Sequence, residues 1–476
     1  MTKLNISQHQ SSEHSRRTFM TQAAGGVGLL ALSQLVQGSS QQAQAALGGT
    51  AVAPISPSAR SVICLFQHGG PSQIDLFDPK PGMRKWDGKP YPSGELEVHA
   101  HQEIGNVLAS PFQFRPRGDS AIELSELLPH FSKVIDDATL IRSMTTESVD
   151  HEAALRRFHT GRKDAGFPTW GSWVTYGLGT ECENLPAYVV LADPSGLPID
   201  GNRNWSSGWL PAVHQGTPFR AEESNLRRAG NVPKNARDDH FAFLDQLNRH
   251  HLREHPENGD LAARIQNFEL AAQMQTSVPA FLDISDETQA TQQMYGLDRP
   301  ETRDYGMRCL LARRLVERGV RFVQIFLSGQ PWDTHTKNAS SLIDLCAAND
   351  QPSAALVADL KQRGLLESTV VVWGGEFGRL PIAQGVDGRD HNRHGFSLWV
   401  AGGGFRSGYV HGETDDFGYR AVKDPVSVHD LHATLLHTLG LDHFRLTYPR
   451  DGRATSLTDA EVTQARVIDQ LLKESC

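Results

Sequence analysis

The sequence Ser61-Val-Ile-Cys-Leu-Phe-Gln67 is a short apolar run, and His68-Gly69-Gly70-Pro71-Ser72 follows it directly. The length, the apolar character and the β-branched residues of the run are typical of a strand in the middle of a sheet. The glycines and the proline predict a tight loop where this strand ends. The polar side chains of His68 and Ser72 are therefore expected just beyond the end of a central strand.

Similar apolar runs recur along the chain and alternate with helical patterns. We predict further strands over residues 138–141, 187–191, 320–327, 369–373 and 396–401. We predict helices over residues 123–135, 151–160, 304–318, 342–363 and 424–441, and a polar, helical tail to residue 472. This alternation favours an α/β fold with a doubly wound, mostly parallel sheet and helices on both faces. The polar residues from about 195 to 300 predict a partly helical insertion over one edge of the sheet.

The first 45 residues have the features of an export signal. The pair Arg16-Arg17 precedes an apolar run over residues 23–36, and Ala43-Gln44-Ala45 offers small residues at the cleavage positions. We expect a Tat-type signal peptide over residues 1–45, a mature domain over residues 46–476, contact with the Tat translocase during export, and a periplasmic or secreted location. Glycines interrupt the short apolar run, which disfavours a stable membrane span, and a retained anchor is the alternative.

The composition excludes some classes of protein. The chain of 476 residues has a formal net charge of −9 and no long basic stripe, so nucleic acid is not expected as a partner. Its five cysteines are sparse and show no Cys-x-x-Cys spacing, which argues against a disulfide scaffold. One disulfide after export stays open, and the sequence does not choose its partners.

Candidate metal ligands follow four of the predicted strands. Because the carboxyl ends of parallel strands share one edge of a sheet, ligands that are distant in sequence can meet there. Aspartate and histidine are ligands of Zn²⁺ and related divalent ions. In extended backbone, residues two apart point to the same side, and residues three apart can align on one helical turn. The candidates are His68 with Ser72 and Asp75; Asp333 with His335; Glu376 with Arg379; and Asp390 with His391 and His394.

Each group also has a simpler interpretation. His68 could be a hydrogen-bonded structural histidine, Asp333 and His335 a hydrogen-bonded pair, Glu376 and Arg379 an ion pair, and Asp390 a helix cap. Their recurrence at the same topological place favours a metal site. His151, at a predicted helix start, is the acid–base candidate because its ordinary pKa near 6.5 suits neutral pH. The remaining histidines of the closing helix, His429, His432 and His437, are expected to be solvated or capping.

The motifs occur in a familiar order from about residue 61 to the C-terminus, and this order resembles the DUF1501 family of exported bacterial proteins. That family belongs with the alkaline phosphatase/sulfatase superfamily, so the resemblance implies an alkaline phosphatase-like fold. The segments that carry the resemblance are His68-Gly-Gly-Pro-Ser-Gln-Ile-Asp75, Ser207-Gly-Trp-Leu-Pro-Ala-Val213, Trp332-Asp-Thr-His335, Trp373-Gly-Gly-Glu-Phe-Gly-Arg379, Gly388-Arg-Asp-His391 and Val428-His-Asp-Leu-His-Ala-Thr434.

Superfamily members hold one or two divalent metals and attack phosphate or sulfate esters with a serine, threonine or modified cysteine. This chain departs from that pattern, since His68 stands where an aspartate is usual and Glu376-Phe377-Gly378 stands where Asp-His-Gly is common. His151 begins the stretch that matches the one holding the sulfatase nucleophile, and no Cys-x-Pro-x-Arg occurs. Ser72, Thr146, Ser148 or a metal-activated water would therefore have to attack.

The sequence thus predicts a secreted, metal-dependent hydrolase of phosphate or sulfate esters, acting on a small-molecule or glycan ester. The alternative is a non-catalytic envelope binding or structural protein that retains the fold. The expected cofactor is a divalent ion, Zn, Mn, Ca or Mg. The expected catalytic residues are His151, Ser72 and Arg379, with Arg379 or Arg389 holding an anionic ester oxygen. The expected metal ligands are His68, Asp75, Asp333, His335, Glu376, Asp390, His391 and His394.

Overall fold

The computed structural model describes residues 55–92, 94, 96–98, 105–182, 184–219, 234–255 and 281–474, together with 261, 265, 268–270, 274 and 278. The chain divides into residues 1–50 and residues 51–476. The predicted signal peptide and its cleavage site lie outside the described residues. Within the described part, none of the helices has the length and apolar character needed to cross a membrane.

The larger unit is built on a nine-stranded sheet with the order β12-β4-β11-β8-β1-β7-β5-β6, and β15 pairs with β4. Among the described strands of this sheet, β11 alone runs antiparallel to its neighbours, and β1 is parallel to both β7 and β8. The predicted mostly parallel sheet is therefore confirmed. The strands are β1 (Ser61–Phe66), β4 (Ala138–Thr145), β5 (Tyr188–Leu191), β6 (Thr217–Phe219), β7 (Phe322–Phe326), β8 (Thr369–Gly374), β11 (Phe396–Ala401), β12 (Tyr409–His411) and β15 (Val426–Ser427).

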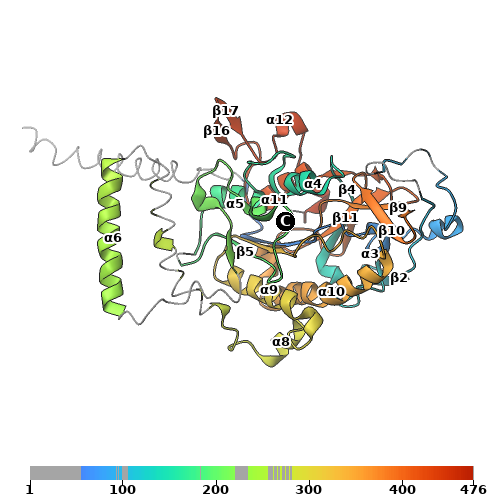
Figure 1. The fold of residues 1–476 in the computed structure, drawn as a ribbon, viewed down its shortest axis with the longest axis horizontal. Helices are drawn as coiled ribbons and strands as arrows, with labels where there is room; N and C mark the ends of the chain where they lie inside the picture. Colours follow the sequence, from blue (N-terminus) through green and yellow to red (C-terminus); the bar gives the residue numbers. More distant parts are fainter. Residues whose placement is uncertain are drawn as a thin grey trace, which may run out of the picture. The chain divides into compact units, whose positions relative to one another are not determined.

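Helices cover both faces of the sheet, as predicted, and each face has its own apolar core (Figure 1). Successive side chains of a strand point to opposite faces, so Ile63 and Leu65 of β1 join one core while Cys64 and Phe66 join the other. This two-sided burial explains why the strand is an unbroken apolar run. One core contains α9 (Pro300–Glu317) and α10 (Asn338–Gln362); the other contains α4 (His151–Thr160), α5 (Trp170–Leu178) and α11 (Val428–Thr438).

The helix predicted over residues 123–135 and the continuous helical tail are wrong, whereas the predicted closing helix is present but shorter. The segment 123–135 instead forms β3 (Ile122–Ser125), which pairs with β2 (Phe114–Arg117), and two short 3₁₀ turns, because Pro129 interrupts the helical pattern. The closing helix is only α11, which Ser427 caps in a reciprocal arrangement with Asp430. The tail contains β16 (Tyr448–Arg450), β17 (Arg453–Thr455), α12 (Ala460–Thr463) and η9 (Asp469–Leu471) in place of a continuous helix.

The segment between β8 and β11, where the sequence predicted no strand, is a hairpin. Strand β9 (Gly378–Gln384) pairs antiparallel with β10 (Gly388–Asn392), so that His391 lies opposite Arg379. Gly388 is required here because a Cβ atom would lie 1.8 Å from the carbonyl oxygen of His335. The remaining elements are α3 (Gln73–Leu76), η2 (Pro81–Trp86), η5 (Gly201–Trp205), η6 (Ala212–His214), α6 (Lys234–Glu254), α8 (Gln289–Met294), η8 (Leu366–Ser368), β13 (Glu413–Thr414) and β14 (Ala421–Lys423).

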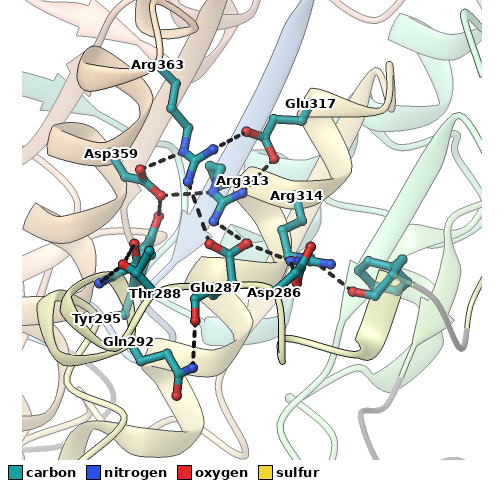
Figure 2. A network of polar contacts seen from close by, with 12 residues as sticks. Asp286, Glu287, Thr288, Gln292, Tyr295, Arg313, Arg314, Glu317, Asp359 and Arg363 are labelled. Carbon is teal, nitrogen blue, oxygen red and sulfur yellow. Dashed lines mark hydrogen bonds and ion pairs between the residues drawn. The ribbon is translucent and has the colours of Figure 1, made fainter.

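A network of buried charges joins α9 and α10 to the segment before α8 (Figure 2). The guanidinium of Arg313 lies 2.6–2.9 Å from carboxylates of Glu287, Glu317 and Asp359. Arg314 lies 2.6 Å from Glu287 as well. Because both arginines are almost fully buried, the surrounding carboxylates are needed to compensate their charge. The network ties the last part of the 195–300 segment to the helices on this face of the sheet.

Candidate metal centre

Four side chains from distant parts of the chain meet at the edge where β4 and β7 end. His151 is the first residue of α4, Asp333 and His335 lie between β7 and α10, and His391 lies on β10. One ligand atom of each lies within 4.8 Å of the others. The structure therefore gathers Asp333, His335 and His391 at one edge of the sheet, and it adds His151 to them.

One carboxylate oxygen is the common partner of the three imidazoles. The Nε2 atoms of His335, His391 and His151 lie 2.9, 3.1 and 3.2 Å from Oδ1 of Asp333. Imidazole nitrogens and a carboxylate oxygen are donors that Zn²⁺ and related ions bind in proteins.

The other nitrogen of each imidazole is held by an acceptor. Nδ1 of His151 donates to Oε1 of Glu376 at 2.6 Å, and Nδ1 of His391 donates to the carbonyl of Val149 at 2.6 Å. Nδ1 of His335 contacts Oε1 of Gln384. A neutral imidazole with its proton on Nδ1 has a lone pair on Nε2. In that tautomer each Nε2, which faces Asp333, can ligate a cation, as it does in metal-binding histidines.

The charges of these groups are strongly coupled. Burial would lower the pKa of His151, but hydrogen bonds to Asp333 and Glu376 outweigh it and raise the pKa to about 9. Burial lowers the pKa of His391 to about 4, aided by the charges of Arg379 and His151. Burial opposes ionisation of Asp333, yet hydrogen bonds from the three histidines hold its pKa well below the ordinary value. Without a metal, His151 is protonated and pairs with the carboxylates of Asp333 and Glu376. The positive charge of His151 then disfavours protonation of His391.

Two fully buried residues fix the centre from behind. Glu376 accepts from His151 and from the backbone N–H of Gly69, at 2.9 Å. Arg379 donates to Asp333 at 2.7 Å and to the carbonyls of Gly70 and Arg389, each at 3.0 Å. The guanidinium of Arg379 is thus engaged inside the protein, where it positions Asp333 rather than facing solvent.

The structure places Asp75 and Ser72 in a separate buried group. Both oxygens of Asp75 pair with Arg389, at 2.8 and 3.1 Å. Asp75 also accepts from the Ser72 hydroxyl at 2.6 Å and from the Asn338 amide at 2.9 Å. Arg389 and Ser72, which the sequence offered for anion binding and attack, are thus occupied with Asp75.

Three further predicted ligands do not join the four. Nε2 of His394 lies 2.7 Å from Glu97, because β10 ends before residue 394 and no helical turn aligns it with His391. Asp390 accepts from the backbone N–H of His391 at 2.8 Å. His68 is fully buried on the α4 face of the sheet, between Phe66 and Phe326. Metal binding by these three residues stays a prediction.

The supporting acceptors Val149 and Gln384 were missed by sequence reasoning. Val149 contributes only its backbone carbonyl, which every residue has, so no pattern could reveal it. Gln384 ends β9, and the sequence predicted no strand in the hairpin that brings it to His335. Glu376 could be identified from the sequence, because it is an acidic residue shortly after a predicted apolar strand.

We expect Glu376→Gln to weaken zinc binding by about 10- to 100-fold, because the neutral amide holds the His151 ring less firmly. Competition with a chromophoric chelator measures this affinity. Glu97→Gln is the matched control, since Glu97 accepts from His394 outside the four-residue cluster. Equal affinities for the Glu376 variant and the wild type would contradict the supporting role of Glu376.

Comparisons with known proteins identify the family of this chain. No curated protein matches it. Among solved structures, it is similar to a sulfatase from Pseudoalteromonas sp. (13% identity, TM-score 0.33, 86% of this chain and 71% of the other). It is also similar to a phosphonate monoester hydrolase from Silicibacter pomeroyi (11% identity, TM-score 0.32, 72% of this chain and 73% of the other). A third similar structure is that of a protein in the alkaline phosphatase superfamily from Vibrio parahaemolyticus (9% identity, TM-score 0.34, 81% of this chain and 69% of the other). The model of the family described as "Protein of unknown function (DUF1501)" matches residues 59–472, and the chain belongs to that family.

Proposed function

We propose that this protein is a metal-dependent hydrolase of phosphate or sulfate esters that works outside the cytoplasm after export. The observation that carries the proposal is the convergence of three Nε2 atoms on one oxygen of Asp333, with each Nδ1 held by an acceptor. Three imidazoles and one carboxylate suit Zn²⁺ or a similar transition ion. Ca²⁺ and Mg²⁺ prefer oxygen ligands, so this donor set disfavours them.

The site opens on the side of His335. Its side chain is 29% exposed, whereas those of Asp333, His151 and His391 are 13%, 11% and 3% exposed. A bound divalent ion would polarise an ester oxygen and lower the pKa of water from 15.7 to about 7. The ester enters beside His335, and Glu376 and Arg379 keep the ligands in place from the buried side.

Water from this open side is the favoured nucleophile. The Ser72 hydroxyl donates to Asp75 and is buried, so it is not poised for attack. His151 has its Nδ1 proton engaged with Glu376 and its Nε2 directed at the cluster, which makes it a ligand in this proposal rather than a free acid or base.

Elemental analysis of the purified protein, combined with a screen of aryl phosphate and aryl sulfate esters, tests the proposal. We expect a stoichiometric transition metal, hydrolysis that increases with added Zn²⁺ or Mn²⁺ more than with Ca²⁺ or Mg²⁺, and loss of both metal and turnover in His391→Ala. Absence of stoichiometric metal, or turnover that survives His391→Ala, would sink the proposal.

The second candidate is a non-catalytic envelope protein in which the metal stabilises the fold. The engagement of Ser72 with Asp75 and the absence of a Cys-x-Pro-x-Arg motif favour it. It predicts that a chelator lowers the Tm while no ester in the screen is hydrolysed. Reproducible turnover that depends on His391 would exclude it.

A further inference from the structure

Four buried histidines behind the metal centre take no part in the proposed chemistry. They are His68, His159, His432 and His429, and all are at least 96% buried. Of the two predicted alternatives for His429 and His432, solvated or capping, the solvated one is wrong, because α11 packs into the core on this face. Five of their ring nitrogens have no hydrogen-bond partner in the part of the chain that the structure describes: both of His68, Nε2 of His159, Nδ1 of His432 and Nδ1 of His429.

These four rings follow one another through the protein. His68 and His159 both contact Phe66, with ring centroids 4.7 and 4.5 Å away, and both contact Phe326, at 5.2 and 5.5 Å. Nε2 of His432 donates at 2.8 Å to the carbonyl of the residue before His159. His429 and His432 are three residues apart on α11 and so lie on the same side of that helix.

The two ends of this series lie at the metal centre and near the surface. Beside His68, the backbone N–H of Gly69 donates to Glu376, which in turn holds His151. At the other end, Nε2 of His429 accepts from Arg157 at 2.6 Å. Arg157 reaches Glu147, whose side chain is 56% exposed.

The hydrogen-bond partners fix where the protons are. Gln324 donates to Nδ1 of His159, so the unpartnered Nε2 of His159 carries a proton. His432 donates through Nε2, so its unpartnered Nδ1 is an acceptor. His429 accepts at Nε2, so its unpartnered Nδ1 is a donor. Donor and acceptor nitrogens therefore alternate from His159 to His429.

Leaving these nitrogens without partners would be costly. Each buried, unsatisfied polar group has lost its hydrogen bonds to water without gaining others. For five such nitrogens the cost would be a large part of the small net stability of a protein. Bound water is the usual way to satisfy such groups.

We propose that His68, His159, His432 and His429 line a hydrated path that carries a proton from the candidate metal centre to solvent near Glu147. This role rests on the proposed hydrolase function. When water attacks a sulfate monoester, the new O–S bond forms, the ester O–S bond breaks, and the leaving oxygen takes one proton of the water. The second proton is released, because the product is the sulfate dianion. An ester bound beside His335 covers the open side, so this proton needs a route at the rear.

The protonation state of the path suits this role. Burial lowers the pKa of His68 and of His429 to about 4, and that of His432 to about 3. At neutral pH these rings are neutral, so none of them retains a proton that moves along the bound water.

His159→Phe tests the path, because phenylalanine fits beside Phe66 and Phe326 but has no ring nitrogen. We expect kcat on an aryl sulfate to fall about tenfold or more, with KM and metal content unchanged and with partial restoration by imidazole buffer. Hydrolysis of an aryl phosphate should fall less, because hydrogen phosphate keeps the proton. His214→Phe is the control, since His214 is buried with an unpartnered Nε2 and packs against Tyr176 away from the path.

An unchanged kcat in His159→Phe, or an equal loss in His214→Phe without rescue by imidazole, overturns the path. A high-resolution crystal structure gives a readout that does not need activity: we expect water within hydrogen-bond distance of Nε2 of His159 and Nδ1 of His432. Absence of water at Nε2 of His159 and Nδ1 of His432 would overturn the path even if esters are hydrolysed. Waters at both positions in a protein that hydrolyses no ester would overturn the hydrolase function and proton delivery but support the hydrated path.

Discussion

Replacing Asp333 with asparagine is expected to remove the metal from the purified protein and to abolish metal-dependent hydrolysis. Asp333 is the single anion among the four clustered residues, and its Oδ1 faces all three Nε2 atoms. Asparagine keeps the shape of the side chain but supplies no negative charge to offset a divalent cation. Loss of a supporting residue costs about 10- to 100-fold in metal affinity, so loss of this ligand should cost more than about 100-fold. Elemental analysis and chelator competition measure the loss.

Asp193→Asn is a matched control for this prediction. Asp193 also follows a parallel strand, β5, and pairs with a buried arginine, Arg308, at 2.8 Å. The side chains of Asp193 and Asp333 are similarly exposed, at 16% and 13%. We expect Asp193→Asn to keep its metal. If Asp333→Asn also keeps a full equivalent of metal, Asp333 is not a ligand of that metal and the prediction is wrong.

The apolar part of the fold could be predicted from the sequence, because the central strands are buried on both faces. Strand β1 shows this plainly, since its alternate side chains enter two different cores and every position is apolar or small. The same reasoning places polar residues beyond the strand ends. It led to Asp333 and His335, which the structure brings to one edge of the sheet.

Polar residues that are buried could not be assigned to partners in this way. The partner of Asp75 is Arg389, 314 positions away, and periodicity contains no information about such a pair. Strand β10 was not predicted because its buried side chains are polar. They are held inside by specific polar partners, and no apolar pattern marks the strand. His432 was misjudged for the same reason, since its burial depends on a carbonyl on α4.

We expect Asp75→Asn to lower the free energy of unfolding by about 3–5 kcal/mol, because it leaves a buried guanidinium without its counter-charge. Both Asp75 and Arg389 are completely buried, and two hydrogen bonds join them. The Ser72 hydroxyl and the Asn338 amide also lose a charged acceptor. Urea denaturation followed by tryptophan fluorescence measures the change.

The double variant Asp75→Leu with Arg389→Met separates structure from metal binding. If the pair is structural, removing both charges should restore much of the stability, because apolar residues of similar volume replace buried ion pairs well. The double variant should then retain its metal, since neither residue belongs to the four-residue cluster. A double variant that is stable but metal-free would instead make Asp75 a ligand, as its position after the first strand suggests. A single variant as stable as the wild type would show that Arg389 finds another counter-charge or reaches water.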